Sequence, residues 1–206
     1  MLHVFDMDGT LLTGAATVEL ARHFDKLAMG EDVETRFLAG TVTDTEFWQT
    51  LLDICGEATE ADLDAAFHGA RWMEGVAAVF ADIRARGETA IVISQSPTFF
   101  VDRLRAWGAH ETYGSAVEIG VPVLDDATLS AEMKVTITEE ALSRLGLAPE
   151  ECVAYGDSGS DIGLFRWLPH TVAVNAAPAI RALAAAHYSG SDLREAYALG
   201  RELATA

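Results

Sequence analysis

The chain has 206 residues, and half of them are hydrophobic, which is enough to bury a core and excludes intrinsic disorder. Its formal charge of −18 argues against nucleic acid or anionic membranes as partners, because no basic cluster is present to displace counterions. No apolar segment reaches the roughly 20 residues that a membrane-spanning helix needs, and a polar motif begins almost at once, so we expect a cytoplasmic protein without a signal peptide.

Short apolar runs that end at polar or glycine-rich corners predict buried strands. They cover Leu2–Phe5, Thr89–Ile93, Cys152–Tyr155 and Thr171–Val174. Patterns typical of helices cover Gly75–Arg86, Phe99–Trp107, Val135–Leu145 and Ala177–Ala186. The segment Tyr113–Leu129 predicts a further strand and a hairpin. This alternation predicts an α/β fold, with a Rossmann-like parallel sheet between two helical layers.

The segment from residue 14 to residue 74 interrupts this alternation. Its helical patterns cover Val18–Leu27, Asp32–Leu38, Thr45–Ile54 and Ala61–Phe67, and no convincing strand lies among them. We therefore predict two domains, an α/β core of residues 1–13 and 75–206 and a small all-helical cap of residues 14–74. The neighbourhoods of Gly14 and Gly75 are the natural candidates for hinges.

Two carboxylates, Asp6 and Asp8, stand where the first predicted strand runs into a glycine turn. Like charges this close disfavour joint ionisation, so such a pair indicates a bound cation or a member that keeps a proton. Both conditions suit phosphoryl chemistry. Asp8 has a simpler alternative reading, a negative charge at the N-terminus of the next helix.

Further polar residues follow other predicted elements. Ser94 and Gln95 come after the second predicted strand, and Asp157 and Asp161 follow the strand that begins at Cys152. Lys134 is the only lysine between Lys26 and the end of the sequence. Because the carboxyl ends of parallel strands meet at one edge of a sheet, we expect these groups to converge there. Taken singly, Ser94 is typical of a turn or cap and Asp161 of a helix N-terminus.

In this order, the DxDGT motif, the strand-end serine, the lysine and the GDSxxD segment resemble the haloacid dehalogenase superfamily. The resemblance is greater to its phosphoserine phosphatase-like branch, in which a helical cap is inserted between the first and second motifs. It implies the haloacid dehalogenase fold and a phosphatase with Asp6 as the nucleophile that becomes an aspartyl-phosphate. Asp8 would be the general acid and base. A Mg²⁺ ion would be held by Asp6, Asp157 and the backbone carbonyl of Asp8.

The same resemblance assigns the remaining residues. Lys134, Ser94 and Gln95 would bind the phosphoryl group of the substrate, with the backbone N–H of Gln95 at a helix start. Asp161 would hold Lys134 or a water on the metal, and Thr10 would support the first loop.

The cap departs from that of phosphoserine phosphatases. Ala15 occupies the position of their substrate-binding glutamate, and no arginine lies between Phe37 and Ala70. Glu19 could replace the glutamate only in a rearranged cap. A closed pocket without these charges would bind a zwitterion poorly, so we expect a small phosphate ester other than phosphoserine.

Two alternatives remain open, a phosphotransferase of the same superfamily and a non-catalytic module that binds a phosphorylated metabolite. The sequence does not fix the substrate, the pathway, the oligomeric state or the extent of cap motion.

Overall fold

A computed structural model describes residues 1–124 and 126–205 of the chain. Within them, six strands form one sheet in the order β3-β2-β1-β4-β5-β6, and every neighbouring pair is parallel. The strands are β1 (Leu2–Phe5), β2 (Thr89–Pro97), β3 (Glu111–Ser115), β4 (Cys152–Gly156), β5 (His170–Val174) and β6 (Ala186–Tyr188). Phe5 of β1 lies opposite Val92 and Tyr155. The predicted α/β architecture is confirmed.

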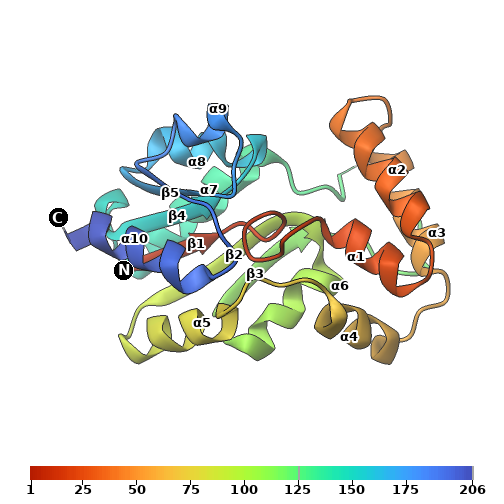
Figure 1. The fold of residues 1–206 in the computed structure, drawn as a ribbon, viewed down its shortest axis with the longest axis horizontal. Helices are drawn as coiled ribbons and strands as arrows, with labels where there is room; N and C mark the ends of the chain where they lie inside the picture. The colour runs from red at the N-terminus through yellow and green to blue at the C-terminus, as the bar shows by residue number, and fades with distance from the viewer. Residues whose placement is uncertain (125, 206) are drawn as a thin grey trace.

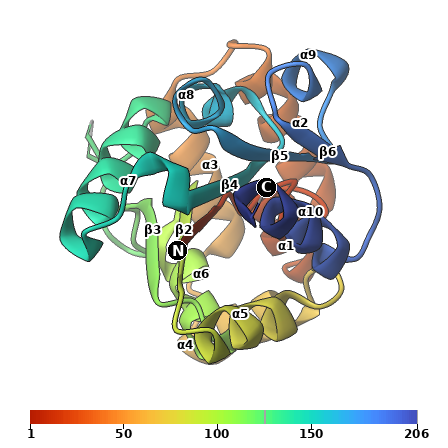
Figure 2. The same ribbon diagram turned by 90° about the vertical axis from the view of Figure 1, so that its left-hand side faces the viewer.

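Side chains that alternate along each strand enter two separate cores, one on each face of the sheet. One face carries α5 (Val76–Ala85), α6 (Thr98–Val101), the 3₁₀ helix η1 (Asp102–Trp107) and α10 (Leu193–Thr205). The other carries α7 (Ala131–Leu145), α8 (Ile162–Trp167) and α9 (Pro178–Arg181), as Figure 2 shows. Two short 3₁₀ helices flank β4, η2 (Pro149–Glu151) and η3 (Gly159–Asp161). In the described part of the chain, no helix combines the length and apolar character needed to cross a membrane.

Four helices gather beyond the carboxyl ends of the strands (Figure 1). They are α1 (Ala16–His23), α2 (Leu27–Leu38), α3 (Asp44–Cys55) and α4 (Glu60–Gly69). Phe67 of α4 packs against Phe100 and Trp107 of the α/β core with ring centroids 5.4 and 4.8 Å away, which attaches these helices to the core. The helical character predicted for this segment is confirmed, while its division from the core at residues 14 and 74 stays a prediction.

Two predicted helices end several residues earlier than expected. The first cap helix ends at His23 because Asp25 adopts a left-handed conformation with φ of 57°, so Leu27 begins α2 instead. The helix predicted for Ala177–Ala186 ends at Arg181, because Ala186 pairs with Val172 of β5 and starts β6.

The segment predicted as a strand and a hairpin, Tyr113–Leu129, contains only the end of β3. Its described residues after Ser115 form no second strand, and Asp125 lies outside the described residues. The loop is instead fastened by Ser115, whose Oγ donates to the backbone oxygen of Gln95 and accepts from the backbone nitrogen of Leu129 at 3.0 Å.

A buried histidine lies on β1, away from the carboxyl end of the strand where the acidic residues gather. His3 is fully buried, with Nε2 3.0 Å from Glu88 Oε2 and Nδ1 3.3 Å from the Tyr155 hydroxyl. A neutral ring with its proton on Nε2 satisfies both partners, since Arg201 also neutralises Glu88 at 2.7 Å. Burial lowers the pKa of His3 to about 4, against the hydrogen bond to Glu88.

Candidate active site

A cavity of about 540 Å³ lies between the strand ends and the cap helices. Asp6 and Asp8 reach it from the loop after β1, and Asp157 reaches it from the loop after β4. Glu34 and Trp48 line it from α2 and α3. The sheet topology therefore brings together residues that are more than a hundred positions apart, at the end of a parallel sheet where ligands bind.

Lys134, from the first turn of α7, lies buried behind Asp6. Its Nζ is 2.8 Å from Asp6 Oδ1, 2.8 Å from Asp161 Oδ1 and 3.0 Å from Ser160 Oγ. Burial alone would lower the pKa of Lys134, but the Asp6 and Asp161 carboxylates outweigh it and raise the pKa above its ordinary value. The ammonium group is therefore a fixed positive charge beside Asp6.

Asp157 carries a buried oxygen, Oδ1, that has no hydrogen-bond partner among the described residues. Burial, reinforced by the charge of Asp161, raises the pKa of Asp157 to about 7. Gly9, with φ of 74°, approaches this carboxyl so closely that a Cβ there would lie 2.1 Å from Oδ2. A carboxyl oxygen without a hydrogen-bond partner, in a carboxylate packed tightly against the backbone, is suited to bind a small hard cation.

Three carboxylates meet at this point, since Asp6, Asp157 and Asp161 each offer an oxygen within 4.8 Å of the others. The two oxygens of Asp161 are already engaged. Oδ1 accepts from Lys134, and Oδ2 accepts from the backbone N–H groups of Asp157 and Ser158 at 3.0 and 3.2 Å. Asp6 and Asp157 are therefore the carboxylates left to bind a divalent ion, and Asp161 positions the lysine and the loop.

Asp8 is held by donors on both carboxyl oxygens. Oδ1 accepts from the backbone nitrogen of Ala16 at 2.6 Å, and Oδ2 accepts from the hydroxyls of Ser94 at 3.0 Å and Ser96 at 2.6 Å. Because Ala15 has no side chain that can cap α1, Asp8 supplies the cap. Burial raises the pKa of Asp8, and the hydrogen bonds from Ser96, Ala16 and Ser94 oppose that rise. Asp8 thus caps α1 with a carboxyl group whose pKa is raised.

Ser94 and Gln95 lie within β2, which continues to Pro97, so the predictions that they follow the strand and that Gln95 begins a helix were wrong. The next helix, α6, starts only at Thr98. The Ser94 hydroxyl is fully buried and is directed at Asp8, and it also accepts from the backbone nitrogen of Ser96 at 3.0 Å. Gln95 lines the cavity while its Nε2 donates to the Leu129 carbonyl at 3.0 Å. Thr10 is buried in the first loop, and its Oγ1 has no partner in the described part of the chain.

Ser96 and Glu34 are among the cavity residues that were not singled out from the sequence. Ser96 is signalled only by the Ser-x-Ser-Pro corner, and nothing near Glu34 in the sequence points to the site. Glu19, considered as a substitute for the missing cap glutamate, is buried and bound by Arg71 at 2.5 Å and Arg22 at 3.6 Å. The Glu19 carboxylate therefore forms ion pairs within the cap.

Curated relatives match most of the chain in sequence. A phosphoserine phosphatase from Idiomarina loihiensis is 23% identical over 199 residues, which cover 94% of this chain and 90% of that protein. A phosphoserine phosphatase from Archaeoglobus fulgidus is 24% identical over 200 residues, and the match covers 93% of this chain but 57% of that protein. This chain thus spans little more than half of the archaeal relative.

The fold is also shared with solved structures. A substrate-bound phosphoserine phosphatase complex superposes with a TM-score of 0.77 at 20% identity, covering 94% of this chain and 95% of that one. The family model described as haloacid dehalogenase-like hydrolase matches residues 3–166, a span that contains Asp6, Lys134 and Asp157. Since that span is most of its length, the chain belongs to the haloacid dehalogenase-like hydrolase family.

Proposed function

We propose that this protein is a Mg²⁺-dependent phosphomonoesterase that hydrolyses a small phosphate ester through an aspartyl-phosphate on Asp6. The observation that carries the proposal is the meeting of three groups beside the cavity: Asp6, Lys134, and the Asp157 Oδ1 that has no hydrogen-bond partner among the described residues. The relatives named phosphoserine phosphatase support the reaction class.

In the first step, an oxygen of Asp6 forms a bond to phosphorus while the bond from phosphorus to the ester oxygen breaks. The electron pair of that bond goes to the leaving alcohol, which takes a proton from Asp8. The raised pKa of Asp8 suits this role, because the group keeps a proton at a pH where an exposed aspartate has lost it. The hydrogen bond from the backbone nitrogen of Ala16, at the start of α1, holds Asp8 in position for the transfer.

In the second step, Asp8 is the base. It takes a proton from a water molecule whose oxygen bonds to phosphorus, and the bond between phosphorus and Asp6 breaks, which regenerates the carboxylate. Lys134 stays charged throughout and offsets the negative charge on Asp6 and the phosphoryl oxygens.

The donor set fits Mg²⁺, which prefers oxygen ligands and keeps several waters. Asp6 and Asp157 would hold the ion together with the backbone carbonyl of Asp8, as the resemblance implies. When bound, the ion supplies positive charge that the phosphoryl oxygens need in a site with an excess of carboxylates.

The test is phosphate release from para-nitrophenyl phosphate and from sugar, polyol and amino-acid phosphates and nucleotides, with Mg²⁺ and with EDTA. We expect release that requires Mg²⁺ and is lost in Asp6→Asn, while the exposed control Asp53→Asn retains it. Transfer of phosphate to an added alcohol in place of water would favour the phosphotransferase, and tight binding of an ester recovered unaltered would favour the binding module.

A further inference from the structure

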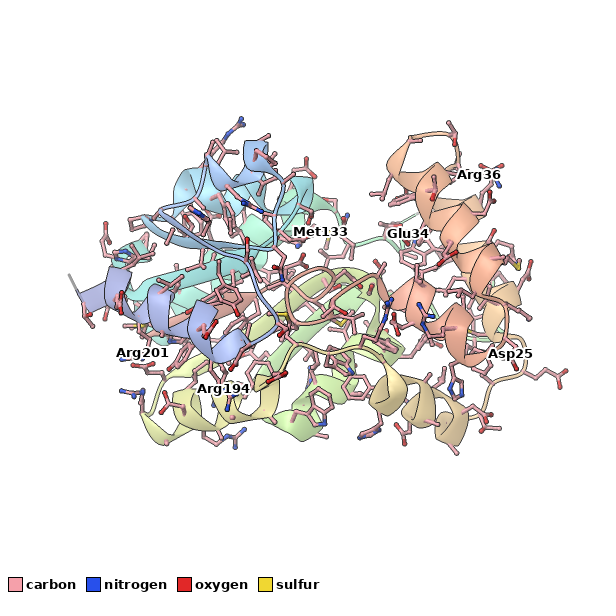
Figure 3. The ribbon with its side chains drawn as sticks, in the orientation of Figure 1. Asp25, Glu34, Arg36, Met133, Arg194 and Arg201 are labelled. Carbon is pink, nitrogen blue, oxygen red and sulfur yellow. The ribbon has the colours of Figure 1, made fainter. Side chains whose placement is uncertain are left out.

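The cavity has a second polar feature, distant in sequence from the phosphoryl site. Glu34 projects from the side of α2 that faces the α/β core, whereas Arg36 lies on the opposite side (Figure 3). Its Oε2 is buried and has no hydrogen-bond partner among the described residues. A carboxyl oxygen left in this state is costly unless a ligand supplies the partner.

The surroundings of Glu34 offer no cation. Among the described residues that line the cavity, none is a lysine or an arginine, and Lys134 is paired with Asp6 and Asp161 behind the floor. Burial and the charge of Asp8 raise the pKa of Glu34 to about 7, with a hydrogen bond from Thr17 acting in the opposite direction. A ligand that carries its own positive charge would relieve this burial penalty.

Aromatic side chains share the cavity with Glu34. Phe37, Phe47 and Trp48 line the same cavity, and the Trp48 Nε1 already donates to the Thr128 hydroxyl at 2.7 Å. Aromatic faces beside a carboxylate accommodate an ammonium group and its carbon chain. They do not provide for a second anionic group.

The position of Glu34 depends on the packing of α1 against α2. Gly30 allows the two helices to approach, since a Cβ on it would lie 2.4 Å from the Ala21 Cβ and 3.2 Å from the Thr17 carbonyl oxygen. Gly30 lies about one helical turn before Glu34, so this close approach sets where Glu34 enters the cavity. The Glu34 carboxylate is thus positioned by the packing of a cap helix.

We propose that Glu34 binds the ammonium group of the substrate, and that the enzyme acts on phosphate monoesters of small amino alcohols that lack a carboxylate. The inference rests on the proposed phosphatase function and names its substrate class. The phosphoryl group lies at Asp6, and the amine reaches the cap. Phosphoserine is disfavoured because no lysine or arginine lines the described part of the cavity to pair with its carboxylate, while Glu34 would repel it.

The test compares 2-aminoethyl phosphate with ethyl phosphate, which lacks the amine, and with phosphoserine, which adds a carboxylate. We expect kcat/KM for 2-aminoethyl phosphate to exceed that for ethyl phosphate by between about ten- and a hundredfold, the range for a hydrogen bond to a charged group. In Glu34→Gln that ratio should fall to near one. The control Glu31→Gln, on the exposed side of α2, should keep the wild-type ratio.

Binding without turnover gives an independent readout. In the presence of Mg²⁺, 2-aminoethylphosphonate should bind more tightly than ethylphosphonate by calorimetry, and Glu34→Gln should remove the difference. Equal hydrolysis and equal binding of the amine and neutral compounds would overturn the amine site while leaving the phosphatase proposal intact. Absence of Mg²⁺-dependent hydrolysis for every ester would instead overturn the phosphatase proposal, and phosphonate binding would then decide the amine site alone.

Discussion

Replacing Asp157 by Asn is expected to make the metal-free protein more stable at pH 8 and to remove its stabilisation by Mg²⁺. The folded protein holds the pKa of Asp157 at about 7, against 3.8 for an ordinary aspartate. The unfolded chain therefore loses this proton first, so stability falls as pH rises from 4 to 7 and stays reduced above that window.

The magnitude follows from the size of that shift. At about 1.4 kcal/mol per pKa unit, ionised Asp157 lowers the free energy of unfolding by roughly 4 kcal/mol. An Asn amide in the same place lacks hydrogen-bond partners, which costs roughly 2 kcal/mol and leaves a net gain of roughly 2 kcal/mol. For a chain of this size, that gain raises Tm by roughly 4–8 °C.

The assay is thermal unfolding at pH 8 in EDTA and at rising Mg²⁺, with the exposed control Asp53→Asn. Wild type should gain about 2.7 kcal/mol at a Mg²⁺ concentration one hundred times Kd, whereas Asp157→Asn should gain nothing. A metal-free Asp157→Asn protein that unfolds below wild type would refute the reasoning, because the carboxylate would then stabilise the fold instead of opposing it.

The other predictions concern separate parts of the molecule. Asp6→Asn should abolish phosphate release with the circular dichroism spectrum unchanged, since Lys134 keeps its bond to Asp161; a folded, active variant would exclude Asp6 as the nucleophile. Ser96→Ala removes a hydrogen bond that lowers the pKa of Asp8, so the basic limb of the single-turnover pH profile should move upward, and an unmoved limb would exclude Asp8 as the acid. His3 takes up its proton only near pH 4 when folded, so the protein should lose roughly 3 kcal/mol of stability between pH 6.5 and 4. His3→Gln should show a correspondingly shallower acid dependence in urea titrations.

The sheet was predictable because a strand covered on both faces is a continuous apolar run. β4 (Cys152–Gly156) shows this pattern without interruption, and β1 (Leu2–Phe5) shows it apart from the buried His3. The polar residues that follow both strands mark the functional edge. The topology then places Asp6 and Asp157 together without further information. β6 (Ala186–Tyr188) was not predictable in this way, since it has only three residues and owes its extended form to pairing with β5.

The cap side of the site could not be predicted for a different reason. Glu34 lies on a helix whose start was placed five residues too late, because the left-handed turn at Asp25 gives no clear pattern in the sequence. Its approach to the cavity depends on the close crossing at Gly30. The contact of Ser94 with Asp8 was also not predictable. Its hydroxyl donates to Asp8 because the loop after β1 passes within hydrogen-bond distance.

The most direct test of the account is to trap the phosphorylated residue. Asp8→Asn should accumulate the intermediate from para-nitrophenyl phosphate with Mg²⁺, because that leaving group needs no acid while the second step needs the base. Borohydride reduction followed by peptide mass spectrometry should then find homoserine at position 6. Turnover by wild type with no reducible acyl phosphate, or with the phosphoryl group on another residue, would contradict the central claim.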